Sequence, residues 1–326
     1  MRKTAGLLSL LFLLSTSATH AQVLGAQPLT ILLSPQYPAP YQTVTVTPQS
    51  TLIDLARATV TISVDGKVVA QSTGGGSASF TAGGAGSSNT ITVSANSPEG
   101  SYQTTATVHP TNVALIEEPV STTHPFYEGA AQVAIQGEVR FVAMADLRTS
   151  ANGAPLDPAK LVYSWHVDSQ ALESNSGIGK SSVSVVAPMQ YRDETVSVTV
   201  STQDGSITGS ASATLAPTDP TILFYRDGPL IGPNFDTAIG DFYSLVGDED
   251  SFRAVGYSFS TFPTINWSVN GTPSVSQPTI TLRPTGTGAG SATVSATASF
   301  PGSYVSASRE MTVQFGQSTS HSIFGL

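Results

Sequence analysis

Cysteine is absent from the sequence, so no disulfide bond can hold the folded chain together. Each domain must therefore be stable through its own hydrophobic core. Without thiolate ligands a transition-metal site would depend on histidine, and the histidines after residue 21 lie in separate neighbourhoods without metal-binding spacing. These residues are His109, His124, His166 and His321. The sequence indicates no transition-metal site.

Charge is scarce as well, at 11% of the residues, and most of it is negative. The chain has 13 basic residues against 22 acidic ones, a net charge of −9 that loses two further positive charges if Arg2 and Lys3 are removed. An acidic chain with scattered basic residues offers no electrostatic surface to nucleic acid or anionic lipid. We therefore expect no nucleic-acid partner.

The first residues carry the pattern of an export signal. A basic start precedes an apolar run over 5–14, and small residues follow up to Ala21. This order is typical of a secretory signal peptide with cleavage before Gln22. The apolar run has about ten residues, whereas a helix that crosses a bilayer needs about twenty. We expect a leader at 1–21 and no transmembrane segment in the mature chain, and a cysteine-free exported β-protein fits a bacterial source.

A repeat of about one hundred residues organises the rest of the chain. One segment of alternating apolar and polar residues occurs three times, with Ile62, Trp165 and Trp267 at the shared position. Each copy ends in a turn pair, and the Asp-Gly and Asn-Gly pairs among them are a strong hairpin signal. The pairs stand at 65–66, 168–169 and 270–271.

Other alternating segments surround each copy in the same order. Alternation with a period of two means that one face of each strand is buried and the other exposed. Strands of this length with turn residues between them predict an antiparallel β-sandwich. We expect strands at 44–46, 133–141 and 252–257, around Phe80, at 183–185 and 280–282, at 91–95, 196–200 and 292–296, and at 102–108, 207–215 and 304–313.

The segments around the two tryptophans resemble the central strand of PKD-type and bacterial immunoglobulin-like domains. Residues 163–168 read Tyr-Ser-Trp-His-Val-Asp, and residues 265–271 read Ile-Asn-Trp-Ser-Val-Asn-Gly. Strand C of immunoglobulin-like domains carries a tryptophan at this place, although the first repeat has Ile62 and no disulfide is available. The resemblance covers most of the chain as architecture. The resemblance implies that the domains act as spacer or adhesion modules of a bacterial surface protein.

Together these patterns predict an all-β protein of three tandem immunoglobulin-like antiparallel β-sandwich domains after an N-terminal signal peptide. Joints that contain proline, at 109–112 and 216–220, separate the repeats. Short joints stiffened by proline predict a semi-rigid rod. The expected parts are the signal peptide 1–21, domains at 27–110, 111–217 and 218–315, and a C-terminal tail at 316–326.

Two segments, 115–129 and 223–236, mix aromatic and acidic residues with proline and glycine. Either each is an edge strand followed by a loop that folds over the sandwich, or each presents an exposed surface to a partner. In the second case the candidate partner-binding residues are Phe126, Tyr127, Phe224 and Tyr225.

The tail is a polar linker with an apolar tip. It is either a disordered end or a short docking peptide whose binding residues are Ile323, Phe324 and Leu326.

No set of residues indicates an enzyme. The Gly-x-Ser-x-Gly motif of serine hydrolases is absent, and the glycine-rich runs at 74–76 and 83–86 lack the context of a phosphate-binding loop. The densest carboxylate cluster is Asp248-Glu249-Asp250, which lacks the spacing of an EF-hand. We expect a solvated turn there, with a weak calcium site as the alternative, and we expect no other cofactor.

The sequence thus favours a non-catalytic exported protein, extracellular, on the cell surface or in the periplasm. It would act as a structural or adhesion protein that binds other surface proteins or a polysaccharide, for example as an accessory of a pilus. A carbohydrate-binding module that uses the aromatics of 224–262 is the alternative, and an enzyme with an unrecognised acid pair is a remote one. Exposed coplanar aromatics on one sheet face would favour sugar binding, whereas buried aromatics would favour a spacer.

Overall fold

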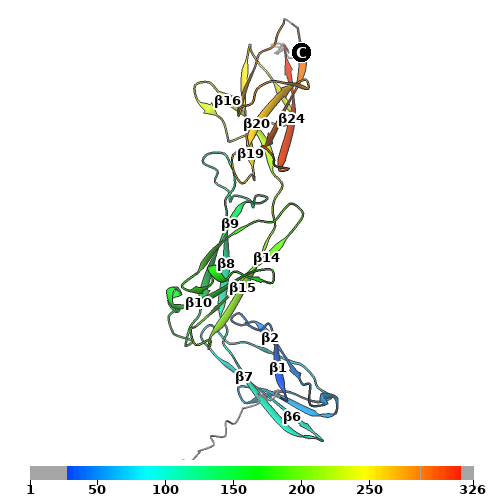
Figure 1. The fold of residues 1–326 in the computed structure, drawn as a ribbon, viewed down its shortest axis with the longest axis vertical. Helices are drawn as coiled ribbons and strands as arrows, with labels where there is room; N and C mark the ends of the chain where they lie inside the picture. Colours follow the sequence, from blue (N-terminus) through cyan, green and yellow to red (C-terminus); the bar gives the residue numbers. More distant parts are fainter. Residues whose placement is uncertain (1–27, 287, 317–326) are drawn as a thin grey trace, which may run out of the picture.

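The computed structural model of the chain describes residues 28–286 and 288–316, and the expected signal peptide lies outside them (Figure 1). In the described residues nearly all regular structure is β-strand. The helical elements there are short 3-10 turns, and no helix is long and apolar enough to cross a membrane. The turns are η1 (Leu55–Arg57), η2 (Pro158–Lys160) and η3 (Glu173–Asn175).

The first sandwich packs a three-stranded sheet, β1-β2-β5, on a four-stranded sheet, β4-β3-β6-β7. Neighbouring strands in both sheets are antiparallel. The strands are β1 (Thr30–Ser34), β2 (Thr43–Gln49), β3 (Thr59–Val64), β4 (Lys67–Thr73), β5 (Ala78–Thr81), β6 (Asn89–Ser97) and β7 (Gly100–Val108).

The second sandwich repeats this order, with sheets β8-β9-β13 and β11-β10-β14-β15, and β12 pairs with β10. The first, second and fifth main strands again form one sheet, and the others form the second. The strands are β8 (Asn112–Pro119), β9 (Glu138–Asp146), β10 (Val162–Val167), β11 (Gln170–Ala171), β12 (Gly177–Ile178), β13 (Ser182–Val186), β14 (Glu194–Ser201) and β15 (Thr208–Leu215).

The third sandwich has the same core order with one strand added to each sheet, β17-β16-β19-β22 and β18-β24-β23-β20-β21. The added β18 runs parallel to β24. The strands are β16 (Thr221–Gly228), β17 (Gly232–Pro233), β18 (Phe242–Ser244), β19 (Asp250–Tyr257), β20 (Thr264–Val269), β21 (Thr272–Pro273), β22 (Thr279–Leu282), β23 (Gly290–Ser299) and β24 (Ser306–Phe315). Three tandem immunoglobulin-like sandwiches confirm the predicted fold class.

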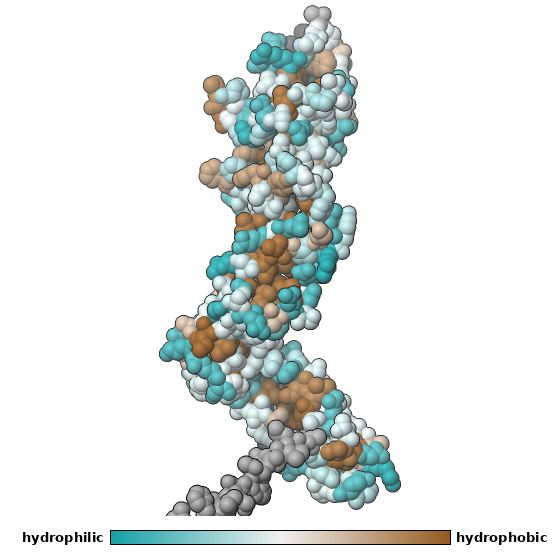
Figure 2. Space-filling model, viewed as in Figure 1, coloured by the Kyte–Doolittle hydropathy of each residue, from teal (hydrophilic) through white to brown (hydrophobic). Residues whose placement is uncertain are grey.

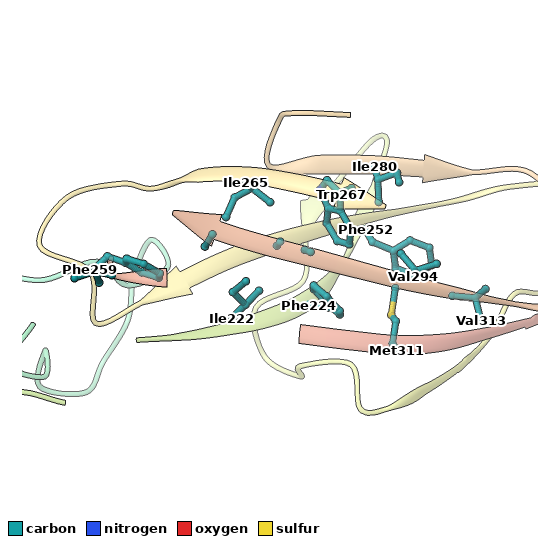
Figure 3. Close-up of a cluster of buried hydrophobic side chains, with 14 of the residues drawn as sticks. Ile222, Phe224, Phe252, Phe259, Ile265, Trp267, Ile280, Val294, Met311 and Val313 are labelled. Carbon is teal, nitrogen blue, oxygen red and sulfur yellow. The ribbon is translucent and has the colours of Figure 1, made fainter. Parts of the chain in front are cut away.

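The repeated position that defined the sequence repeat lies at the centre of each core. Ile62, Trp165 and Trp267 are 1%, 0% and 2% exposed. Each tryptophan also satisfies its indole N–H, which donates to the carbonyl of Lys180 at 2.9 Å or of Gln277 at 3.0 Å. In the third core the indole lies against Phe224, with ring centres 5.0 Å apart. Figure 3 labels both residues within this core.

The turn pairs after these central strands share a second repeated feature, a side-chain hydrogen bond. Their first residues adopt positive φ, which Asp and Asn tolerate better than most residues. In each sandwich the side-chain oxygen then accepts a backbone N–H from the start of the sixth main strand. The pairs are Asp65 with Thr90 at 2.7 Å, Asp168 with Thr195 at 2.9 Å, and Asn270 with Thr293 at 2.9 Å.

One predicted strand was wrong in its bounds. We expected a strand over 133–141, but β9 begins at Glu138, and Val133 to Gly137 belong to the connection that precedes it. Tertiary contacts decide this, because Val133 is buried in the second core while Ile135 is buried in the third. The predicted boundary between the second and third domains, at 217 and 218, remains a prediction.

The three sandwiches follow one another along an elongated molecule (Figure 1). On the face shown in Figure 2, apolar surface forms several separate patches along the length and does not form one continuous area. Patches of this kind mark candidate places of contact.

Candidate interaction surfaces at the joints and the free end

The connection between β8 and β9, residues 120–137, crosses from the second sandwich to the third, and we call it the strap. Its residue Thr122 is hydrogen-bonded on both sides of its backbone. The N–H donates to the carbonyl of Phe259 at 2.8 Å, and the N–H of Ser258 donates to the carbonyl of Thr122 at 3.2 Å. The strap is thus paired with the end of the third sandwich as a short strand would be.

The hydroxyl of Thr122 adds two more bonds inside the third sandwich. It donates to the carbonyl of Gly256 at 2.7 Å and accepts the N–H of Phe259 at 3.2 Å, and the residue is 6% exposed. Figure 3 shows Phe259 at the end of the core where the chain from the second sandwich arrives. Separation of the two sandwiches would break these buried hydrogen bonds.

The other end of the strap also contacts the third sandwich. Ile135 is 4% exposed within the hydrophobic core of the third sandwich. The N–H of Thr218 donates to the carbonyl of Val133 at 2.8 Å, and Ala134 forms a parallel bridge with Thr218. The second joint is therefore a packed interface, with hydrophobic burial and backbone pairing on both sides of the strap.

Between its two anchors the strap covers the outer face of the β16–β19 sheet with aromatic rings. His124 stacks on Phe235 with ring centres 4.7 Å apart, and Tyr127 meets His124 edge-on at 5.3 Å. The hydroxyls of Tyr225 and Tyr257 are 2.6 Å apart. Burial, and then the Tyr225 hydroxyl, raise the pKa of Tyr257, so this phenol stays a neutral hydrogen-bonding group.

Beside this aromatic cluster lies a groove of about 450 Å³. Its sides come from the strap, from β19 and from the loop that precedes β20, and most of its lining is apolar. Phe262, one of the lining residues, is 82% exposed. The groove residues also include His124, Pro125, Pro233, Phe235, Pro263 and Pro278.

The first joint uses the corresponding connection of the first sandwich, residues 35–42 between β1 and β2. There the N–H of Thr111 donates to the carbonyl of Pro38 at 3.1 Å, and Pro38 is buried. Tyr37 lines a depression with residues of β14 and β15 on the outer face of the second sandwich. In both joints the connection between the first two strands therefore contacts the sandwich that follows.

The third sandwich has an equivalent connection, residues 229–249 between β16 and β19. It carries four strongly exposed apolar side chains, Leu230, Ile231, Phe242 and Val246, which are 97%, 88%, 72% and 74% exposed. Because β16 runs away from the second joint, Leu230 and Ile231 lie toward the far part of the sandwich, on the loop that projects beside β16 in Figure 1. The turn after β16 therefore exposes two adjacent apolar side chains.

The predicted partner-binding residues separate in the structure. Phe126, with φ 62°, is 96% exposed at the tip of the strap, and Tyr127 is 43% exposed beside it. Phe224 is 0% exposed within the third core and Tyr225 is 3% exposed under the strap. Phe224 is therefore corrected to a core residue, because its ring packs on Trp267 and cannot reach a partner. The tail residues Ile323, Phe324 and Leu326 lie outside the described residues.

The three candidate calcium ligands do not converge. Asp250 is 8% exposed, accepts from Arg226 Nε at 3.0 Å and accepts the Tyr243 hydroxyl. Burial, and then the bond to Asp250, raise the pKa of Tyr243 to about 12. Glu249 pairs with Arg283, whereas Asp248 is exposed. Arginine already neutralises two of the carboxylates, so a calcium ion would have to displace these partners.

Among residues 28–286 and 288–316, no group of three or more histidine or carboxylate side chains is arranged to hold a metal ion. The aromatic residues of 224–262 are mostly internal, with Phe224, Phe252 and Phe259 at 0% exposure. The arrangement therefore supplies apolar contact and strand pairing.

Comparison with solved structures finds other tandem sandwich arrays. Fibronectin(III)-like modules of Clostridium thermocellum CbhA are 12% identical over 57% of this chain and 92% of theirs, with a TM-score of 0.26. The three N-terminal domains of the bacteriophage RB49 Highly Immunogenic Outer Capsid protein are 13% identical over 89% and 99%, with a TM-score of 0.26. Sidekick-1 immunoglobulin domains 1–5 are 12% identical over 86% and 56%, with a TM-score of 0.32.

Scores this low carry no argument about function, and the fold assignment rests on the strand order of this chain. No protein family matches the sequence, and no curated protein matches it. The fold and the joints define the class of tandem immunoglobulin-like β-sandwich proteins. Within that class the chain is similar to immunoglobulin and fibronectin III arrays in architecture.

Sequence reasoning missed Thr122 and Ile135, which fix the second joint. One signal was available, since the connection over 120–137 is far longer than a hairpin loop and ends in the apolar run Val133-Ala134-Ile135. We expected that run to start a strand. The packing of Ile135 in the core of the third sandwich becomes visible only in the structure.

Proposed function

We propose that this chain is a non-catalytic binding protein that is exported and serves as a structural or adhesion element outside the cytoplasm. The observation that carries the proposal is the strap, which inserts Thr122 and Ile135 into the third sandwich. A joint of this kind holds two sandwiches end to end. An extended body with fixed joints suits a protein that keeps a binding surface at a distance from its point of attachment.

The apolar surface of the chain supports the same proposal. Exposed apolar side chains gather at the strap tip and at residues 230–231 in the turn after β16, where a partner protein would bury them. More specifically, the chain would be an accessory protein of a surface assembly such as a pilus.

Export is tested by expressing the full chain in a bacterial host and fractionating the cells. We expect a product that begins at Gln22 and is recovered outside the cytoplasm. A control with Leu11 and Leu13 changed to Arg interrupts the apolar run and should keep the chain inside. A full-length product that stays in the cytoplasm would contradict export.

The carbohydrate alternative keeps one supporting observation, the exposed Phe262 in a groove with His124 and Phe235. Binding of the purified chain to a glycan array and to protease-treated cells separates the two functions. We expect no glycan signal and a loss of cell binding after protease treatment. A glycan signal that Phe262→Ala abolishes and Phe242→Ala retains would favour the carbohydrate function instead.

A further inference from the structure

The connection between the first two strands has the same use at both joints of the molecule. In the first sandwich, residues 35–42 contact the second sandwich through Pro38. In the second sandwich, the strap contacts the third through Thr122 and Ile135. The surface that receives each connection is also the same, namely the end of the next sandwich at which its first strand begins.

The receiving surface is best defined at the second joint, where it has three parts. At the second joint these are Thr218 before β16, the connection after β19 with Ser258 and Phe259, and the turn before β24 with Tyr304, whose hydroxyl lies 3.4 Å from Gln136 Oε1. At the first joint the contact includes Thr111 before β8. A sandwich end of this type thus accepts the connection of the sandwich before it.

The third connection also follows the first strand of its sandwich, and it packs Ile239 and Leu245 on its own core. Its turn after β16 exposes Leu230 and Ile231 at 97% and 88%. The earlier connections expose Tyr41 and Phe126 but bury Pro38 and Ile135, the residues that contact the next sandwich. The charged pair of Glu249 and Arg283 stands in the polar depression next to Pro229. An apolar tip with a charged rim is the composition of a protein interface.

We infer that the third connection, residues 229–249, is an interface for the leading end of another immunoglobulin-like sandwich, and that this sandwich is the first one of a second copy. The first sandwich offers the matching end, with the connection over 50–58 after β2 and with Leu52 63% exposed on it. Leu230 and Ile231 then bury against Leu52, and the second copy continues the line of sandwiches.

Such a contact joins two different surfaces, so it is heterologous and each added copy leaves a new free end. The inference rests on the proposed binding role and names its partner. Self-association would therefore build longer rods stepwise, one chain at a time.

The absence of cysteine makes a direct test available. The variant Leu52→Cys with Leu230→Cys places one thiol at each proposed contact, and mild oxidation of the purified mature chain should give a ladder of disulfide-linked multimers. The control pairs Leu52→Cys with Tyr191→Cys, because Tyr191 is 90% exposed on the second sandwich. A ladder that is as strong in the control would overturn the inference.

Sedimentation velocity over a range of concentrations supplies the second measurement. We expect reversible association that Leu230→Asp with Ile231→Asp weakens about tenfold or more, since a buried apolar anchor tolerates a charge poorly. Phe262→Asp, at a side chain that is 82% exposed beside the second joint, should associate as the unchanged chain does. A chain that stays monomeric at every concentration, without an oxidation ladder, would overturn self-association, while export and cell binding would still decide the proposed function.

Discussion

At the residue scale, a few repeated side chains explain why the same fold recurs three times. A large apolar residue, Ile62, Trp165 or Trp267, fills the centre of each core, and an Asp or Asn closes the turn that follows. The side chain of that turn residue accepts a backbone N–H from the neighbouring strand of its sheet. Core size and turn closure together set the register of the central strands.

Removal of a central tryptophan should destabilise one sandwich strongly. Trp267→Ala deletes a ring that is 2% exposed and leaves the Gln277 carbonyl without its donor, so we expect a loss of about 3–5 kcal/mol. Urea unfolding followed by circular dichroism measures it. Phe242→Ala, at a side chain that is 72% exposed, should change stability by less than about 0.5 kcal/mol. Equal losses in both variants would refute the assignment of the core.

Asp65 should make the first sandwich sensitive to acid. The N–H of Thr90, and then the Asn89 amide, lower the pKa of Asp65 below its ordinary 3.8. A lowered pKa in the folded state means that its stabilisation is present above about pH 4 and is lost as the pH falls through the lowered value.

Two substitutions separate the charge of Asp65 from its hydrogen bond. Asp65→Asn keeps the acceptor, as Asn270 does in the third sandwich, and should remove this part of the pH dependence. Asp65→Ala should lower the stability at neutral pH as well. Thermal unfolding between pH 2 and pH 7 measures both, and identical pH profiles for Asp65→Asn and the unchanged chain would refute the role of the carboxylate.

At the element scale, the strap is an element of two sandwiches at once. Val133 packs in the second core, Ile135 packs in the third, and Thr122 pairs with the chain at the end of β19. The third sandwich is therefore incomplete without residues that precede β9 in the sequence. Its stability should depend on side chains that the sequence repeat assigns to the second domain.

Thr122→Val tests this dependence with almost no change of shape. The substitution removes the hydroxyl that bonds to Gly256 and Phe259, and the unsatisfied buried groups should cost the third sandwich about 1–3 kcal/mol. Because the chain has two tryptophans, a Trp165→Phe background leaves Trp267 as the fluorescent reporter of the third sandwich.

The neighbouring Thr123→Val in the same background is the matched control and should change the Trp267 transition by less than about 0.5 kcal/mol. A Thr122→Val loss seen only in the second sandwich, reported by Trp165 in a Trp267→Phe background, would contradict the account of the strap.

Most elements could be predicted from the sequence because their causes are local. Period-two alternation identified the central strand of each sandwich, and Asp65-Gly66 and Asn270-Gly271 identified the turns. The short strands β11, β17 and β21 follow from pairing with a neighbour rather than from their own pattern. The candidate site was predicted less well. Phe224 and Tyr225 are adjacent in a strand and point to opposite faces, yet both are buried. Phe224 lies in the third core, whereas the strap covers Tyr225.

At the scale of the whole molecule, fixed joints turn three small sandwiches into one elongated body (Figure 1). Proline in the linkers was the sequence-based reason to expect a semi-rigid rod. The structure adds a stronger physical reason, because backbone hydrogen bonds and buried side chains span both joints. Motion at the second joint would have to break the contacts of Thr122 and remove Ile135 from the third core.

The distance between spin labels on the second and third sandwiches measures this rigidity directly. Ser184→Cys and Thr297→Cys introduce the only two thiols of the chain at exposed strand positions, one in each sandwich. We predict one narrow distance population for this pair, and a broad one when Thr122→Val and Ile135→Asp are added. A distribution that is already broad with the strap unchanged would contradict the claim that the strap fixes the joint.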